Sequence, residues 1–122
     1  MLPVFHLLLL TFLFSLLSLH PSPSRAAEPI RLGVCTSSTT GCSYDLDVYG
    51  DPNGDQGIPP TDKAGHNIPC LSFKALVSNI KVCACDKCAK CPADQCNAVA
   101  NGACGSSGST GQFRSVCKSS IT

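Results

Sequence analysis

The stretch VCACDKCAKC, residues 82–91, places four cysteines within nine positions. Cysteines at such close spacing act either as thiolate ligands of a soft or borderline metal ion or as halves of disulfide bonds. A redox-active CDKC or CAKC pair is a third reading, but no βαβ pattern surrounds the stretch to place a thiolate at the start of a helix. Features elsewhere in the chain distinguish between a metal centre and disulfides.

The amino-terminal segment supplies the first argument, because it has the pattern of a secretory signal peptide. Residues 7–19 are uncharged and mostly apolar. These 13 residues are too few for a transmembrane helix, which needs about 20. Ser24 and Ala26 then provide the small side chains that signal peptidase requires. We predict a signal peptide over residues 1–26, secretion into the extracellular space, and no transmembrane segment after cleavage.

Secretion favours disulfides, because the secretory route is oxidising. The chain has ten cysteines, an even number that permits five bridges. Cys83 and Cys85 lie two apart in an extended-looking segment, so they should point from one face toward different partners. We expect the cluster to bridge mostly outward, to cysteines before residue 71 and after residue 95. We predict no cofactor and no firm metal site, with all ten cysteines in disulfides: Cys35, Cys42, Cys70, Cys83, Cys85, Cys88, Cys91, Cys96, Cys104 and Cys117.

Strands are indicated by alternating apolar and polar residues. This period of two marks residues 30–34 and 44–48, which are joined by the polar connector TSSTTG. They predict a hairpin near 30–49. Further strands are expected near 80–85 and 112–118.

Short helices are indicated at two places. Phe73, Leu76, Val77 and Ile80 have the spacing of one helical face. A second helix is expected to begin at Pro92 and to end at Gly102. The fold class is therefore a small disulfide-rich protein of mixed β-strands with one or two short helices, in a single cysteine-rich domain over residues 27–122.

A long loop at residues 50–69 is rich in Pro, Gly and Asp. Its stretch DPNGDQGIPPTD has a weak likeness to a calcium-binding loop, with Asp51, Asn53, Asp55 and Asp62 as candidate ligands. However, Gln56 stands where the sharp turn of such a loop needs glycine. The alternative is an ordinary solvated turn, because Asp, Pro, Asn and Gly are common turn formers.

The same loop offers a candidate contact with a hydrolase. Ile58 and Pro59 would be presented on a proline-stiffened segment between Cys42 and Cys70, as a small protease inhibitor requires. Catalysis by the chain itself is not expected. His66 is the single histidine after residue 26, and no nucleophile-elbow sequence appears in a strand–helix context.

Charge is balanced overall but divided along the chain. Residues 28–62 carry a net charge of minus five, and residues 63–122 carry plus five. The lack of a basic excess argues against nucleic-acid binding. Lys81, Lys87 and Lys90 form a candidate interaction patch.

We therefore predict a secreted, cysteine-rich, non-enzymatic protein that acts by extracellular surface recognition, for example in defence or host–microbe interaction. Its partner is expected to be an extracellular protein or glycan, and the protein is expected to be monomeric. A hydrolase inhibitor that uses the loop at 50–69 is the alternative, and a small secreted hydrolase is a further one.

Overall fold

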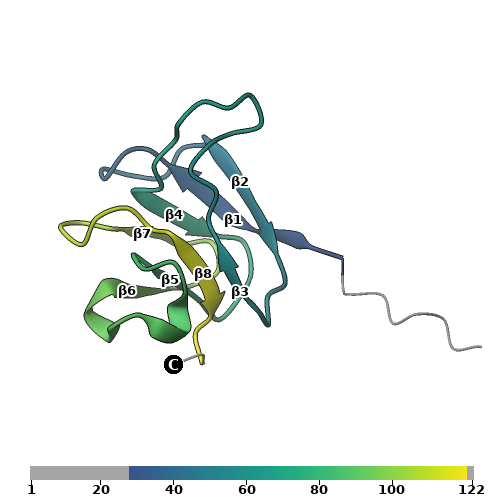
Figure 1. Cartoon of the computed structure of the whole chain (residues 1–122), viewed down its shortest axis with the longest axis vertical. Coiled ribbons are helices and arrows are strands. Elements are labelled where there is room, and N and C mark those ends of the chain that lie inside the picture. The colour runs from purple at the N-terminus through teal and green to yellow at the C-terminus, as the bar shows by residue number, and fades with distance from the viewer. Residues whose placement is uncertain (1–27, 121–122) are drawn as a thin grey trace, which may run out of the picture.

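Two four-stranded antiparallel sheets make up the computed structural model, which describes residues 28–120 (Figure 1). The first sheet has the order β2-β1-β4-β7, with strands β1 (Ile30–Thr36), β2 (Leu46–Gly50), β4 (Ser72–Ala75) and β7 (Cys104–Ser106). The second has the order β3-β8-β5-β6, with strands β3 (Asp55–Gly57), β8 (Ser115–Lys118), β5 (Ile80–Cys83) and β6 (Cys96–Val99). Two 3-10 turns complete the elements, η1 (Cys88–Lys90) and η2 (Ala93–Gln95). The small, disulfide-rich, mainly β fold is confirmed, whereas the signal peptide at 1–26 lies outside the described residues.

The predicted hairpin is confirmed by the pairing of β1 with β2. Cys35 lies opposite Leu46, and Ile30 lies opposite Gly50. The register shifts between Arg31 and Gly33, so Leu32 is the extra residue of a β-bulge. Leu46, Val48 and Gly50 are buried, while the residues between them are more exposed. This alternation turns one face of β2 to the core and the other to solvent.

The helix expected over residues 73–80 is wrong. Ser72–Ala75 is a strand that pairs with β1 on one side and with β7 on the other. Pairing with these two strands buries Phe73 completely. This tertiary pairing determines the local structure, although the spacing of the apolar residues is helical. The chain then turns through Asn79, which has a φ of 61°, a conformation that asparagine tolerates.

The helix expected from Pro92 to Gly102 is also wrong. The chain makes a 3-10 turn at Ala93–Gln95 and continues as the strand β6, which pairs with β5. Gly102 does have a positive φ of 82°. It occupies a turn in which the Ala103 N–H donates to the Ala100 carbonyl at 2.9 Å, so its role is to reverse the chain between β6 and β7.

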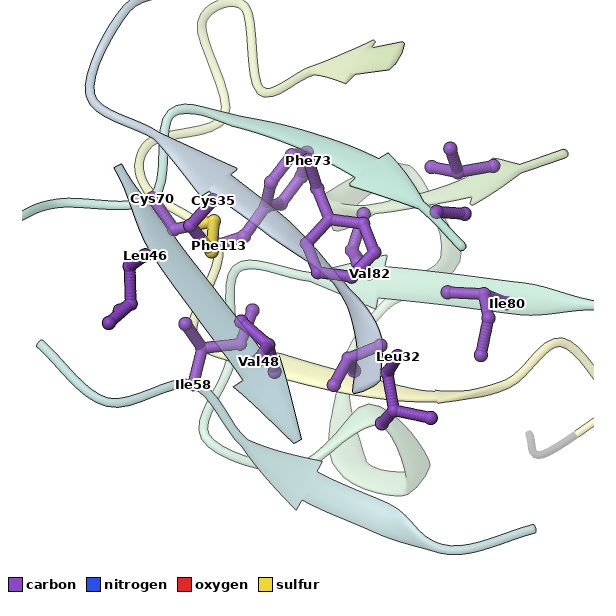
Figure 2. Close-up of a cluster of buried hydrophobic side chains, with 13 residues drawn as sticks. Leu32, Cys35, Leu46, Val48, Ile58, Cys70, Phe73, Ile80, Val82 and Phe113 are labelled. Atoms are coloured by element: carbon purple, nitrogen blue, oxygen red, sulfur yellow. A yellow bond between two sulfur atoms is a disulfide. The ribbon is translucent and has the colours of Figure 1, made fainter. Parts of the chain in front are cut away.

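The core lies between the two sheets (Figure 2). Leu32 and Phe73 come from the first sheet, and Ile80 and Val82 from the second, and all are nearly or completely buried. Phe113 enters from the segment before β8. The full cluster is Leu32, Cys35, Leu46, Val48, Ile58, Cys70, Phe73, Ala75, Ile80, Val82, Val99, Phe113 and Val116. It is a core shared by both sheets.

Five disulfides cross-link the described chain, and it holds no free cysteine. The pairs are Cys35–Cys70, Cys42–Cys104, Cys83–Cys96, Cys85–Cys91 and Cys88–Cys117. The first lies in the core between the sheets (Figure 2). The prediction that all ten cysteines form disulfides is therefore confirmed.

The expected direction of the bridges is only partly right. Cys83 and Cys88 bridge outward to cysteines after residue 95, and Cys83 and Cys85 have different partners as predicted. No cysteine of the cluster bridges to one before residue 71. Cys85 pairs with Cys91 inside the cluster because the η1 turn reverses the chain, with the Cys91 N–H donating to the Cys88 carbonyl at 3.1 Å.

Gly33 is needed where β1 passes under the Phe73 ring. A Cβ atom at this position would lie 2.3 Å from Phe73 Cζ and 2.4 Å from the Lys74 carbonyl oxygen. We expect Gly33→Ala to lower the free energy of unfolding by about 1–3 kcal/mol, because the ring and a backbone oxygen would both have to move.

Gly57→Ala is the matched control, since a Cβ there meets nothing within 4 Å. It should change stability by no more than about 0.5 kcal/mol. Chemical denaturation of both variants measures the difference. Equal stabilities would contradict the close contact of Phe73 with β1.

Within residues 28–120, no helix is long and apolar enough to cross a membrane.

Candidate functional site: the tyrosine groove

A cleft of about 450 Å³ lies between two segments of the chain. One wall comes from residues 44–49, which end in the edge strand β2, and the other from residues 59–64, which belong to the connection from β3 to β4. We call this cleft the tyrosine groove. Its lining residues are Tyr44, Asp45, Leu46, Asp47, Tyr49, Pro59, Thr61, Asp62, Lys63 and Ala64.

Two exposed tyrosines dominate the groove. The relative exposure of Tyr44 is 67%, and that of Tyr49 is 54%. They are the only tyrosines of the chain, which has no tryptophan. Tyr49 faces out of β2 because its neighbours Val48 and Gly50 face the core. Tyrosine offers an apolar ring and a polar hydroxyl, so two of them in one cleft form a surface suited to ligand contact.

The Tyr44 side chain is held in place by charged neighbours. Its hydroxyl donates to Asp47 Oδ2 at 3.1 Å, and Arg31 Nε donates to Asp47 Oδ1 at 2.6 Å. The Arg31 guanidinium also lies 5.9 Å from the centroid of the Tyr44 ring, within the range of a cation–π contact. The hydrogen bond to Asp47 raises the pKa of Tyr44, so the hydroxyl stays protonated as a donor.

The opposite wall is a closed turn organised by Asp62. Its Oδ1 accepts the backbone N–H groups of Ala64 and His66, both at 2.9 Å, and its Oδ2 lies 3.2 Å from His66 Nδ1. A β-bridge between Thr61 and Asn67 closes the base of the turn. The backbone hydrogen bond from His66 is the main cause that lowers the pKa of Asp62.

The turn depends on the ionised carboxylate of Asp62, so protonation of this group in acid weakens it. The carboxylate hydrogen bonds are fully present above the pKa of an unfolded aspartate and are lost as the pH falls through the lower, folded pKa. We expect the amide resonance of His66 to titrate in an NMR experiment with a midpoint below 3.8, the ordinary value for aspartate. Asp62→Asn should abolish this transition. A midpoint at or above 3.8 would contradict the hydrogen bonding described for the turn.

The groove is acidic. Three carboxylates, those of Asp45, Asp47 and Asp62, line it together with one ammonium group, that of Lys63. Asp45 is fixed by Ser37, whose backbone N–H and hydroxyl donate to Asp45 Oδ2 at 2.8 and 3.1 Å. The lining residues therefore carry a net charge of minus two, and the Arg31 guanidinium paired with Asp47 offsets one of these negative charges.

The candidate calcium ligands are not brought together. Asp51 Oδ1 accepts the Asn53 N–H at 2.9 Å, as in an ordinary turn. The Asp55 carboxylate accepts the N–H groups of Cys88 and Ala89, each at 3.1 Å. Asp62 forms the turn described above, on the wall of the groove. Each of the three carboxylates thus has a separate structural role.

Metal-ligand types do cluster elsewhere in residues 28–120. One group is Cys83, Cys91 and Cys96, and the other is Asp55, Cys88 and Cys117. All five cysteines are disulfide-bonded. Because a metal binds the thiolate form of cysteine, these sulfur atoms do not act as ligands in the oxidised protein.

Ile58 does not serve as an exposed contact for a hydrolase. It is 8% exposed, belongs to the core, and donates its backbone N–H to the Arg114 carbonyl at 2.8 Å. Its apolar side chain packs inward because β3 pairs with β8 just before it. Pro59 is exposed and lies on the wall of the groove. The structure thus separates two residues that the sequence had grouped as one binding loop.

The three candidate lysines lie on neighbouring elements. Lys81 is in β5, and its carbonyl oxygen is 3.8 Å from Cys88 Sγ of η1. Lys87 precedes η1 and Lys90 ends it, and both are exposed. Lys87 Nζ also donates to the Asp55 carbonyl at 3.4 Å. None of the three lines the tyrosine groove.

Sequence reasoning missed both tyrosines. The alternation of residues 44–48 predicted that Asp45 and Asp47 lie on the solvent face of a strand, but it did not predict the wall formed by residues 59–64. The sequence did contain a signal for an exposed aromatic residue, since Tyr49 continues the outward-facing alternation of β2 and the chain has no other tyrosine apart from Tyr44.

Comparisons with family models, with curated proteins and with solved structures found no match for this chain.

Proposed function

We propose that the protein is secreted and acts without catalysis, as a binding protein that recognises an extracellular protein or glycan through the tyrosine groove. The observation that carries this proposal is the presence of both tyrosines of the chain, exposed, in one cleft. Exposed aromatic rings are enriched at binding surfaces, and they often dominate the binding energy.

The rigidity of the groove supports binding. Tyr44, Asp47 and Arg31 hold one another through hydrogen bonds and a ring contact, and Asp62 closes the facing turn. A ligand then meets side chains that are already oriented, so less conformational entropy is lost on association.

The disulfides support secretion. Five bridges in a small chain are typical of proteins that fold in an oxidising compartment. The arrangement of His66 supports a role without catalysis, since its side chain is 76% exposed. A general base works best where water is restricted around the substrate.

Replacement of both tyrosines tests the proposal. The purified protein is applied to arrays of glycans and of extracellular peptides, and its strongest ligand is then measured by calorimetry. We expect Tyr44→Ala/Tyr49→Ala to weaken that binding at least tenfold, because aromatic contacts of this kind contribute about 2 kcal/mol or more. Both residues are exposed, so the fold should be retained.

The matched control is Lys87→Ala/Lys90→Ala, which alters two exposed residues outside the groove. It should leave the affinity within twofold of the original. Binding that survives the tyrosine replacements but is lost in the lysine variant would contradict the proposal and would favour the basic patch.

A further inference from the structure

Strand β2 has an open edge. It pairs with β1 on one side and is the last strand of its sheet on the other. No backbone–backbone hydrogen bond among residues 28–120, apart from the pairing with β1, involves residues 46–50. An antiparallel strand directs part of its N–H and C=O groups away from its neighbour, and such groups favour a further strand.

Two other edge strands, β3 and β7, each have one main-chain carbonyl bound by a side chain. On β3, the Asp55 carbonyl accepts Lys87 Nζ at 3.4 Å. On β7, the Ser106 carbonyl accepts Asn97 Nδ2 at 2.8 Å. Side chains thus engage main-chain acceptors of these edge strands, whereas the residues of β2 line a cleft.

The charge of the cleft specifies the partner. Asp45, Asp47 and Tyr49 occupy alternate positions along and just before β2, so they share one face of the strand. Asp62 adds a carboxylate from the facing wall. Because Asp47 and the Tyr44 ring are already engaged by Arg31, basic side chains of an added strand would meet chiefly Asp45, Asp62 and the Tyr49 ring.

We infer that the tyrosine groove binds an extended peptide segment with lysine or arginine at alternate positions, which adds to the open edge of β2 as a further antiparallel or parallel strand. This inference rests on the proposed function and names its ligand. Main-chain hydrogen bonds to β2 would supply affinity, and the carboxylates would supply specificity. The five residues of β2 span about 15 Å, so a segment of about five residues is sufficient.

A glycan would use the groove differently. It would pack on the tyrosine rings and donate hydroxyl groups to the carboxylates, but it would need neither the edge of β2 nor a positive charge. The two ligand classes can therefore be separated by changing the ligand's main-chain donors and its charge independently.

The experiment uses the oxidised protein and four probes. The first is the peptide acetyl-KTKTKTK-amide, and the second is the same peptide with alternate backbone nitrogens methylated. The third replaces lysine by glutamate, and the fourth is a neutral hexasaccharide such as chitohexaose. Tyrosine fluorescence reports on the groove alone, because both tyrosines lie there and the chain has no tryptophan.

We expect the lysine peptide to bind at least tenfold more tightly than the methylated and glutamate peptides. Added salt should weaken its binding, because charges attract less strongly in salt. Amide hydrogen exchange within residues 46–50 should slow when it is bound. Lys63→Glu removes the one cation that lines the groove and should tighten binding about threefold or more, while Lys90→Glu, outside the groove, is the control.

Three results would overturn the inference: equal binding of the methylated peptide, equal binding of the glutamate peptide, or unchanged exchange at residues 46–50. Hexasaccharide binding that depends on Tyr49, without binding of the lysine peptide, would also overturn it but would leave the proposed function standing. The proposed function itself fails if the array ligands bind equally well to Tyr44→Ala/Tyr49→Ala.

Discussion

Replacing Cys35 and Cys70 together by alanine is expected to lower the free energy of unfolding by about 4 kcal/mol or more. This bridge closes a loop across 35 positions, and the chain-entropy model assigns a loop of that size about 4 kcal/mol. Both cysteines are also buried in the core, at 0% and 2% exposure, so their loss removes packing contacts as well. Guanidinium denaturation of the oxidised variant measures the loss.

The matched control is Cys85→Ala/Cys91→Ala. This bridge closes a loop across only six positions, so its removal should cost about 2 kcal/mol. Both of its cysteines are partly exposed, which limits the loss of packing. If the two double variants lost the same stability, the Cys35–Cys70 bridge would not have the structural importance assigned to it here.

Phe73→Ala is expected to cost about 3–5 kcal/mol. The ring is fully buried between the two sheets (Figure 2). It also packs closely against Gly33 of β1. Truncation leaves a cavity that the sheets cannot fill, because disulfides and strand pairing limit their movement. Thermal and chemical denaturation both measure this change.

Tyr49→Ala is the control for Phe73→Ala, since it also removes an aromatic ring from the first sheet. Tyr49 is 54% exposed, so its loss should change stability by no more than about 0.5 kcal/mol. A large destabilisation by Tyr49→Ala would mean that Tyr49 supports the core and would weaken the assignment of its ring to ligand binding.

The parts of the fold that could be predicted from sequence are those set by local pattern. The period of two in residues 44–48 matches the strand β2, because alternation follows directly from the pleat of a half-buried strand. Residues 30–34 also lie in a strand, β1, but its residues from Leu32 to Thr36 are all buried and do not alternate. The even number of cysteines matches five bridges. Pairing of particular cysteines could not be predicted, since it depends on how distant strands come together.

The helix predicted over residues 73–80 shows why other parts were missed. Phe73 and Ile80 have helical spacing, yet they enter the same core from two different sheets. The turn between them includes Ser78 and Asn79, and Asn79 accepts the left-handed conformation. Pairing of residues 72–75 with the strands β1 and β7 determines their structure, and these pairings cannot be read from a single sequence.

The candidate site was missed for a similar reason. Tyr44 and Tyr49 lie near β2 in sequence, but the facing wall comes from residues 59–64 and exists only after β3 has joined the second sheet. Ile58 was expected on the surface, and this same pairing directs it into the core. Composition predicted a disulfide-rich protein, and only the tertiary structure brings the two walls of the tyrosine groove together.

Non-reducing peptide mapping by mass spectrometry tests the central claim most directly, because the account requires one specific set of covalent bonds. The prediction is five linked peptide pairs, Cys35–Cys70, Cys42–Cys104, Cys83–Cys96, Cys85–Cys91 and Cys88–Cys117. A folded protein with ten free thiols, with a tightly bound zinc ion or with a different pairing would contradict it.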